Sequence, residues 1–335
     1  MVTIALASAS IGAPRSRAIT QLIWLAALAV AFATTLAEAA DSFWVGDMIT
    51  FFRPQFVLAV LFLLGVALCL RRWLASAALA LLLVVNAQPL FAIGVPTAAA
   101  ANAGNLRILS ANLLYNNREP AKFTELVARL SPDVIVTQEA RYAWPDLLEA
   151  LPGYPHLVGR EQQRWNTNIV LSRYPMRAAL VADMPPSGNE LGGGSAVRVE
   201  VDLPQRAQPL VVYAIHAPTP RTQAGWKARN RYLDVLAERI AAEPEGTPIA
   251  LAGDWNTPVW SPAYARTLLL SGLEATERSA WPSPTRLFLS LFDRLNLGTP
   301  IDHFAVSRGI GVADFFTGPS FGSDHLPVVA DLALP

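Results

Sequence analysis

The sequence is short of charged residues, cysteine and histidine. Only 16% of its 335 residues are charged, whereas roughly 25% are charged in an average soluble domain. A chain this apolar is expected to place part of its length in lipid. The single cysteine, Cys69, excludes an intrachain disulfide and argues against a cysteine-based zinc site. With only four histidines, few positions are available for imidazole chemistry.

The charged residues are also unevenly distributed along the chain. Five of the 26 basic residues and three of the 26 acidic residues precede residue 104. The rest of the chain therefore holds 21 basic and 23 acidic side chains, a formal charge of −2. Proteins that bind duplex nucleic acid usually concentrate basic charge on one face. The composition therefore gives no electrostatic indication of a nucleic-acid partner.

Three apolar stretches precede residue 100, and each approaches the length that a helix needs to cross a bilayer. They lie at about residues 19–37, 55–70 and 73–95. Residues 1–96 are therefore predicted to form a transmembrane region of two or three helices, because lipid offers backbone polar groups no partners. The chain is expected to be an integral protein of an inner or plasma membrane, with the lipid bilayer as a partner.

Two of these stretches have an alternative interpretation. Arg15 and Arg17 precede the first stretch and alanines follow it, which is also typical of a cleavable signal peptide. Asn86, Gln88 and Pro89 interrupt the third stretch. This stretch either spans the membrane with a kink or packs its polar groups against the other helices.

The arginines predict an orientation in the membrane. Two precede the first stretch and two separate the second from the third, whereas the loop between the first two stretches holds three acidic residues. Because basic loops stay in the cytoplasm, three spans place the rest of the chain, after about residue 100, on the extracytoplasmic side. If the third stretch does not span, this part lies in the cytoplasm instead. The Ala-rich residues 97–104 are predicted to be a linker before a domain at residues 105–335.

Residues 105–335 predict an α+β domain. Short apolar, β-branched runs recur between turn-forming residues, at residues 106–114, 133–137, 168–171, 196–203, 210–215, 249–252, 303–306 and 328–332. Helical spacing recurs at about residues 123–130, 226–240 and 261–270. Because helices separate the strands at only a few points, we expect two mostly antiparallel sheets packed face to face, with helices outside.

Polar side chains cluster at five points, four of them directly after an apolar run. The clusters contain Asn112, Glu139, His216, Asp254 with Asn256, and Ser323 to His325. A rigid sheet holds groups at its strand ends in fixed geometry, and a buried strand has no structural need for such residues at its tip. A single Asn or Asp after a strand more often forms a turn, so only the combination indicates chemistry.

The combination suits hydrolysis of a phosphate ester. That reaction needs a cation on the phosphate oxygens, a base for the attacking water and donors for the developing charge. Hard oxygen ligands such as Glu139 favour Mg²⁺ or Mn²⁺ over zinc. The clusters also contain His216 and His325, two of the four histidines.

In this order, the clusters resemble the endonuclease/exonuclease/phosphatase superfamily, which includes neutral sphingomyelinases and inositol polyphosphate phosphatases. The resemblance covers about residues 105–334. Its most specific segments are residues 253–258 (GDWNTP) and 323–327 (SDHLP), with residues 301–304 (IDHF) between them and a family-like turn at residues 171–175. It implies a four-layer α/β/β/α sandwich.

The resemblance also implies which residues bind metal and phosphate. Glu139 would bind the metal, Asn112 would assist there, and Asp324 would add a metal or water contact. Asn256 and His216 would contact the scissile phosphate, with Asn112 at the same site.

A further set of residues is implied in proton transfer. Asp254 would align or deprotonate the attacking water. His325 would act on the phosphate or the water and would be held in its tautomer by Asp302, as a carboxylate orients a catalytic imidazole. His216 belongs to this catalytic set as well.

One departure from the family pattern bears on the substrate. Many nucleases of the superfamily have an acidic residue two positions after the first Asn, where this chain has Leu114. We expect a membrane-tethered hydrolase of phosphodiesters or phosphomonoesters, with a phosphate-ester substrate that is a lipid or another small ester. A nuclease acting on DNA or RNA and a catalytically silent, membrane-tethered binding module are the alternatives. No obligate protein partner is indicated.

The segment at residues 281–297 is unusually apolar for a position beside the predicted site. Leucines and phenylalanines recur through it just before Asp302. The pattern predicts a short amphipathic helix that covers the sandwich, and the alternative is a loop that dips into the membrane interface.

Overall fold

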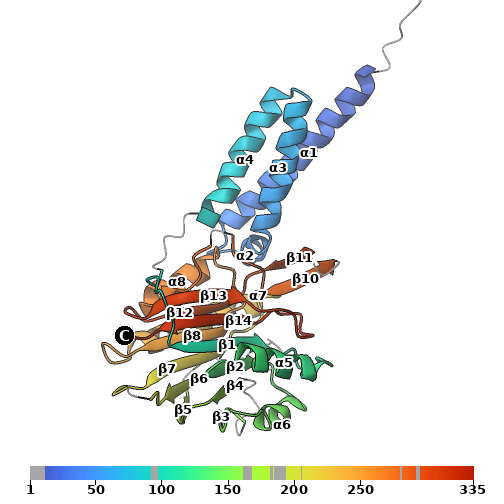
Figure 1. The fold of residues 1–335 in the computed structure, drawn as a ribbon. Helices are drawn as coiled ribbons and strands as arrows, with labels where there is room; N and C mark the ends of the chain where they lie inside the picture. Colours follow the sequence, from blue (N-terminus) through green and yellow to red (C-terminus); the bar gives the residue numbers. More distant parts are fainter. Residues whose placement is uncertain are drawn as a thin grey trace, which may run out of the picture. The chain divides into compact units, whose positions relative to one another are not determined.

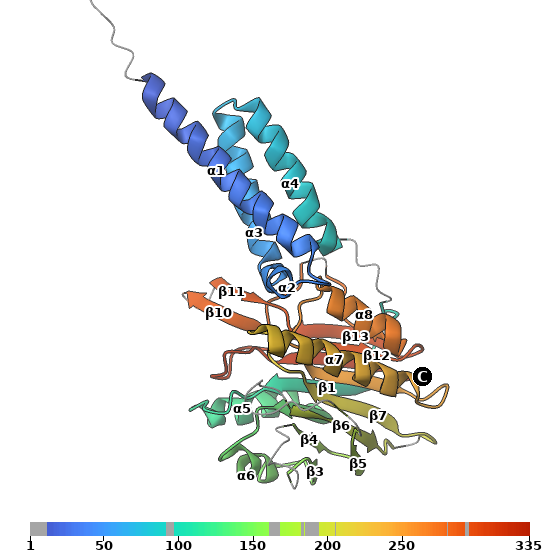
Figure 2. The same ribbon diagram turned by 180° about the vertical axis from the view of Figure 1, so that it is seen from behind.

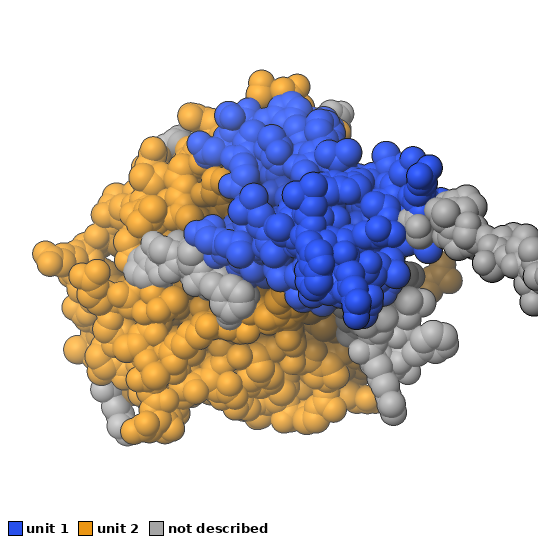
Figure 3. Space-filling model, turned by 90° about the horizontal axis from the view of Figure 1, so that it is seen from above, with its two compact units in different colours: residues 1–92 blue, residues 93–335 orange. Residues whose placement is uncertain are grey.

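The computed structural model divides into two compact units, residues 1–92 and residues 93–335 (Figure 3). It describes residues 12–91, 97–160, 168–181, 184, 194–204, 206–279, 281–291 and 295–335.

The described part of the first unit is helical. Its elements are α1 (Gly12–Glu38), α2 (Trp44–Thr50), α3 (Arg53–Cys69) and α4 (Trp73–Phe91). Arg17–Glu38 and Trp73–Leu90 are each long and apolar enough to cross a membrane, and the bent pair α2 and α3, with 66° between its helices, adds a third if it counts as one span. The predicted two or three helices are therefore present, whereas their insertion in a bilayer stays a prediction.

Helix α4, which contains the internal polar groups, is by itself long and apolar enough to cross a membrane. Asn86 of α4 is buried and donates its Nδ2 to the hydroxyl of Thr34 in α1 at 2.9 Å. The same Nδ2 lies 2.9 Å from the carbonyl of Leu82. A polar side chain within an apolar helix is satisfied by such interhelical hydrogen bonds. Asn86 therefore packs against another helix, as one of the two sequence interpretations expects.

The second unit is built on two six-stranded, mostly antiparallel sheets (Figures 1 and 2). The first sheet has the order β13 (Gly311–Thr317), β14 (Val328–Ala333), β1 (Leu106–Asn112), β2 (Val134–Gln138), β4 (Ile169–Ser172) and β3 (His156–Val158). The second has the order β5 (Met176–Leu180), β6 (Gly194–Val201), β7 (Leu210–His216), β8 (Ile249–Asp254), β12 (Asp302–Val306) and β9 (Glu274–Ala275). Each sheet contains one parallel pair, β1 with β2 and β7 with β8.

The core lies between the two sheets. Ile108 and Val134 of the first sheet share one buried cluster with Val212 and Ala250 of the second. Burial of such side chains supplies most of the free energy of folding, at roughly 25 cal/mol per Å² of apolar surface. The apolar residues on the inner faces of the two sheets therefore pack against each other.

Helices cover the outer faces of the sheets (Figures 1 and 2). On the first sheet lie α5 (Pro120–Leu130) and α6 (Trp144–Glu149), and their Phe123 and Trp144 share a buried cluster with Ile135 and Leu171 of the strands. On the second sheet lie α7 (Gln223–Ala241) and α8 (Pro262–Ser271). The predicted α+β four-layer sandwich is confirmed.

The predicted linker of residues 97–104 is not a free coil over its first half. The amide of Ala98 donates to the carbonyl of Ala275 in β9 at 2.9 Å, and the amide of Ala101 donates to that of Val312 in β13 at 3.0 Å. Ala98 is buried, and its own carbonyl accepts a hydrogen bond from Arg278. We call residues 97–101 the strap, because they join one strand of each sheet.

The described residues of the segment 281–297 do not form the predicted helix. Instead β10 (Arg286–Leu291) and β11 (Leu295–Thr299) pair as an antiparallel hairpin (Figure 1). The helix prediction was wrong because a short run of apolar residues fits either period, and its length and flanking prolines favour strands. Phe288 of the hairpin is 45% exposed. Contact of this segment with a membrane stays a prediction.

Candidate active site

The pairing of the strands gathers the predicted residues at one end of the sandwich. In the parallel pair β1 and β2, Asn112 lies beside the end of β2, and Glu139 follows there. In the parallel pair β7 and β8, His216 lies opposite Asp254. The antiparallel strand β12 begins at the same edge, so that Asp302 also lies opposite Asp254. Five strand ends therefore supply groups to one site.

Asn112 connects the two sheets at this site. Its Nδ2 lies 3.3 Å from Oε1 of Glu139 and 3.2 Å from Oδ2 of Asp254. Its Oδ1 accepts the amide of Leu114 at 3.1 Å. Asn112 is buried, and a buried amide with every group paired is rigid. Two carboxylates from different sheets are therefore held at a fixed separation by one side chain.

Glu139 remains ionised in this arrangement. Burial alone would raise the pKa of its carboxyl group, but the nearby imidazoles and the donors from Tyr115 and Asn112 hold that pKa below its ordinary value. The amide of Tyr115 lies 3.3 Å from Oε2 of Glu139. Glu139 is partly exposed, so its carboxylate is accessible to a ligand from solvent.

Asp254 is the carboxylate at the centre of the site. Its Oδ2 lies 3.6 Å from Nε2 of His216 and 3.9 Å from Nε2 of His325. Its Oδ1 accepts the amide of Asn256 at 2.9 Å. Burial, with the charge of Asp302 next, raises the pKa of Asp254 above its ordinary value. A buried carboxylate with a raised pKa is suited to accept a proton from water.

His325 and Asp302 form a buried pair. Nδ1 of His325 lies 2.9 Å from Oδ2 of Asp302. Burial opposes the imidazolium form, but the charge and hydrogen bond of Asp302 outweigh burial and raise the pKa of His325 to about 9. His325 is therefore protonated at neutral pH, and its Nε2 faces Asp254.

The neighbouring His303 shows how burial changes the pKa of an imidazole that has no hydrogen bond to a carboxylate. It packs edge-on against the rings of Trp255 and Tyr264, with ring centroids 5.5 and 4.8 Å away. Its Nε2 lies 2.8 Å from the carbonyl of Thr257. Burial lowers the pKa of His303 to about 4. His303 is therefore neutral and packs in the core behind the site.

Thr285 is a residue of the site that the sequence did not indicate. Its buried hydroxyl accepts the amides of Ile301 at 2.9 Å and Asp302 at 3.0 Å. Its carbonyl accepts the amide of Leu326, at 2.7 Å. Thr285 therefore touches the backbone on both sides of the His325–Asp302 pair. Nothing in a lone Thr before an apolar run predicts this position.

Asn256 is held in a strained turn. Its φ of +50° lies in the left-handed region, which costs energy for a residue other than glycine and persists only where surrounding contacts enforce it. Its Nδ2 donates to the carbonyl of Ala217 at 2.9 Å. Its own carbonyl accepts Nη1 of Arg229 at 2.9 Å, and this arginine of α7 is fully buried. The buried guanidinium of Arg229 thus holds the turn that is predicted to contact phosphate.

Asp324 differs from the other predicted ligands. Its Oδ2 lies 2.8 Å from Nη2 of Arg286 in β10, and its side chain is 36% exposed. The carbonyl of Asp324 accepts the amide of Leu287 at 2.9 Å. The base of the hairpin is therefore attached to the loop that carries His325. The metal or water contact expected of Asp324 stays a prediction, and it would compete with this ion pair.

The sequence of the domain matches a family model. The model of the endonuclease/exonuclease/phosphatase family matches residues 109–325, which run from β1 to His325. The chain belongs to the endonuclease/exonuclease/phosphatase family. The resemblance inferred from the polar clusters is therefore confirmed.

Solved structures share the fold of this family member. An endonuclease/exonuclease/phosphatase protein from Beutenbergia cavernae is 22% identical, with a TM-score of 0.50 over 68% of this chain and 71% of its own. Sphingomyelinase C from Streptomyces griseocarneus is 20% identical, with a TM-score of 0.50 over 68% and 99%. A mannosyl-6-phosphatase from Bacteroides thetaiotaomicron is 17% identical, with a TM-score of 0.50 over 69% and 100%. No curated protein matches the chain.

Two sets of side chains could hold a divalent cation. Asp254, Asp302 and His325 bring ligand atoms within 4.8 Å of one another, but Nδ1 of His325 and Oδ2 of Asp302 are already paired with each other at 2.9 Å. Glu139, ionised and partly exposed, is the better ligand. Mg²⁺ binds through one or two carboxylates and keeps several waters, so Glu139 fits this ion. Asn112 faces Glu139 with its donor Nδ2 and would have to turn its Oδ1 away from the amide of Leu114 to assist there. Bound there, the ion would neutralise charge on the phosphate oxygens.

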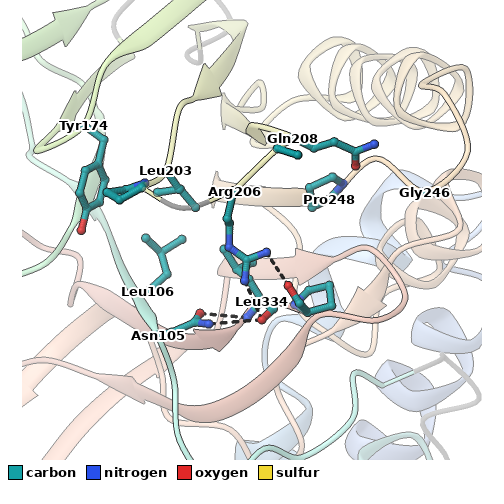
Figure 4. Close-up of a pocket in the computed structure, with 12 residues that line it drawn as sticks. Asn105, Leu106, Tyr174, Leu203, Arg206, Gln208, Gly246, Pro248 and Leu334 are labelled. Atoms are coloured by element: carbon teal, nitrogen blue, oxygen red, sulfur yellow. Dashed lines mark hydrogen bonds between the residues drawn. The ribbon is translucent and has the colours of Figure 1, made fainter.

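A cavity of about 720 Å³ lies away from this site (Figure 4). It is lined by Asn105 and Leu106 before and at the start of β1, and by Gln208 and Pro248 before β7 and β8. These are the strand ends opposite to the catalytic ones. Its Arg206 donates to the carbonyl oxygens of Leu334 and Pro335, at 2.8 and 2.5 Å. The cavity contains none of the predicted site residues, and its guanidinium is engaged by backbone.

Proposed function

We propose that this protein is a membrane-tethered, Mg²⁺- or Mn²⁺-dependent phosphoesterase that hydrolyses a phosphodiester or phosphomonoester. The observation that carries the proposal is the environment of Asp254. One buried carboxylate with a raised pKa faces a protonated His325 and a second imidazole, and shares Asn112 with the ionised Glu139. This arrangement places a base, an acid and a metal ligand around one point.

The proposed reaction is an in-line displacement on phosphorus. Asp254 accepts a proton from the attacking water while the new P–O bond forms. The bond to the alcohol breaks, and the leaving oxygen takes up a proton from solvent water. His325, kept in the imidazolium form by Asp302, and the side-chain amide of Asn256, through the Nδ2 hydrogen that Ala217 does not accept, stabilise charge on the phosphate oxygens. Prearranged donors in a water-poor site stabilise this charge more than water does.

The substrate is proposed to be a small or lipid phosphate ester. The charge of −2 after residue 104 disfavours polyanionic nucleic acid, and the apolar helices of the first unit favour a substrate near a bilayer. Among structures with the same fold are a sphingomyelinase and a sugar phosphatase. They support an ester of this general kind without selecting one.

Activity of the full-length protein in detergent tests the proposal. The panel comprises DNA, RNA, sphingomyelin, phosphatidylinositides and an aryl phosphodiester, each with Mg²⁺, with Mn²⁺ and with excess chelator. We expect metal-dependent cleavage of a lipid or small ester that Asp254→Asn abolishes. Cleavage of nucleic acid alone would show the nuclease alternative. If wild type cleaves nothing with either ion, the domain is a binding module and the proposal is wrong.

The domain is proposed to face the extracytoplasmic side. The arginines that flank the first and second apolar stretches support this orientation. Protease added to intact spheroplasts is expected to cleave the domain without lysis. If the domain resists until the membrane is lysed, while an extracytoplasmic control protein is cut, the orientation is the reverse.

A further inference from the structure

Two exposed tyrosines lie side by side beside Glu139. Tyr115 is 44% exposed and Tyr142 is 78% exposed. Their ring centroids are 6.0 Å apart, and the ring planes are tilted by 56°. Large aromatic side chains stabilise a fold mainly by burial, so a pair left this open to solvent contributes little to the core. The function assigned to Asp254, His325 and Glu139 does not use them.

Each tyrosine occupies a hydrogen-bonded turn that follows a catalytic strand. Tyr115 lies in the turn after β1, closed by the amide of Asn117 on the carbonyl of Leu114 at 2.7 Å. Tyr142 lies in the turn after β2, closed by the amide of Trp144 on the carbonyl of Arg141 at 3.1 Å. Such turns fix the backbone from which the rings project. The ring contact therefore joins the two loops that carry Asn112 and Glu139.

The backbone of these two loops is strained at three positions. Leu114, Glu139 and Tyr142 have φ values of +55°, +57° and +56°. A bulky residue in the left-handed region is a genuine outlier, and such residues cluster at ligand sites, where surrounding contacts enforce them. Tyr142 is mostly exposed, so core packing of its ring does not explain its strained backbone. Binding of a ligand by the ring is the explanation that these observations favour.

The rings lie within reach of a phosphate ester bound at Glu139. The amide of Tyr115 contacts the Glu139 carboxylate at 3.3 Å, so the Tyr115 ring lies within about one side-chain length of a group held there. The phosphoryl group belongs at the metal ligand, and the organic part of the ester must extend away from it. A tilted pair of aromatic faces binds a flat or apolar ring face by stacking.

We propose that Tyr115 and Tyr142 form a subsite for a ring-bearing alcohol portion of the substrate, either a sugar or an aryl group. This inference rests on the proposed phosphoesterase function and specifies its substrate class. The two kinds of ring share the chemistry that the tyrosines recognise, which is a face of C–H or π character. An acyclic alcohol such as glycerol lacks that face.

The test compares variants on matched esters with the full-length protein in detergent and Mg²⁺. The substrates are phenyl phosphate, a hexose 6-phosphate and glycerol 3-phosphate, with the corresponding diesters. Tyr142→Ala and Tyr115→Ala are expected to lower kcat/KM for ring-bearing esters by roughly fivefold or more, mainly through KM. Tyr142→Phe should retain activity, because it keeps the ring. Leu147→Ala, which removes a 43% exposed apolar side chain on α6, is the control for loss of surface.

The outcomes separate this inference from the proposed function. Loss confined to one kind of ring supports the subsite and identifies its ligand, and loss on both supports the shared chemistry. Equal loss on glycerol esters, or no loss on any ester, overturns the subsite while leaving the phosphoesterase intact. If wild type cleaves no ester, the proposed function fails. The affinities of wild type and Tyr142→Ala for phenyl phosphate and for glycerol 3-phosphate, measured by calorimetry, then test the subsite. Equal affinity of the two proteins for phenyl phosphate overturns it.

Discussion

Replacing Asp302 by Asn removes one buried charge and keeps the shape of the side chain. His325 lies 2.9 Å from this carboxylate, which raises the pKa of His325 from 6.5 to about 9 against the effect of burial. Without the charge, that pKa should fall to 6.5 or below. A fall of this size corresponds to roughly 3 kcal/mol of lost interaction with the imidazolium. Asp302→Asn therefore tests whether protonated His325 is needed.

The expected effect depends on pH in a defined direction. At pH 8 a group with a pKa near 9 is about 90% protonated, and one with a pKa of 6.5 is about 3% protonated, so activity should fall about thirtyfold from this cause alone. At pH 6 both forms are mostly protonated, and the loss from this cause should be less than twofold. In the variant, the alkaline limb of the profile of kcat/KM against pH should therefore shift to lower pH.

The assay is the full pH profile of kcat/KM for Asp302→Asn and wild type. Asp234→Asn breaks a 2.9 Å ion pair between α7 and Arg266 of α8. It is the control for loss of one carboxylate, and its profile should coincide with wild type. An Asp302→Asn enzyme that keeps its alkaline limb near pH 9 would refute the reasoning. Higher activity of the variant at alkaline pH would show that His325 acts as a neutral base instead.

Three other predictions concern residues around this pair. Excess chelator should abolish turnover, and added Mg²⁺ should restore it. Glu139→Gln should raise the Mg²⁺ concentration that gives a half-maximal rate at least tenfold. Turnover in excess chelator would show that the reaction needs no metal. Asp254→Asn should lower kcat by several orders of magnitude with an unchanged Tm within a few degrees, and a wild-type rate would exclude it as the base. Thr285→Val leaves two buried amides without an acceptor, at a cost of roughly 1–3 kcal/mol each, so both Tm and kcat should fall. Thr285→Ser, which keeps the hydroxyl, should restore both, and equal defects in the two variants would exclude the hydroxyl's role.

The part of the site that sequence reasoning predicted is the part made at strand ends. Asn112, His216 and Asp254 each end an apolar run that is too short for a typical helix. Parallel pairing then brings those ends to one edge. Local patterns predict the strands, and general rules of sheet pairing predict that their ends meet, so this much needs no long-range information.

The residues that support the site could not be predicted in the same way. Thr285 contacts the backbone of Asp302 only because the hairpin folds against β12 and the loop of His325. Arg229 looks like one of several helix arginines, yet it is the one buried under Asn256. Each depends on a tertiary contact between segments that carry no local signal. The hairpin itself was missed because its leucines also fit a helical period.

The strap has a consequence for association between molecules. It pairs with β9 and β13, and each of these is the last strand of its sheet. An uncovered edge strand presents free amides and carbonyls, which can pair with another chain and start aggregation. The strap thus also shields two open edges of the sandwich. A chain shortened to begin at residue 104 would lose this cover, and edge-to-edge self-association would then compete with the native fold.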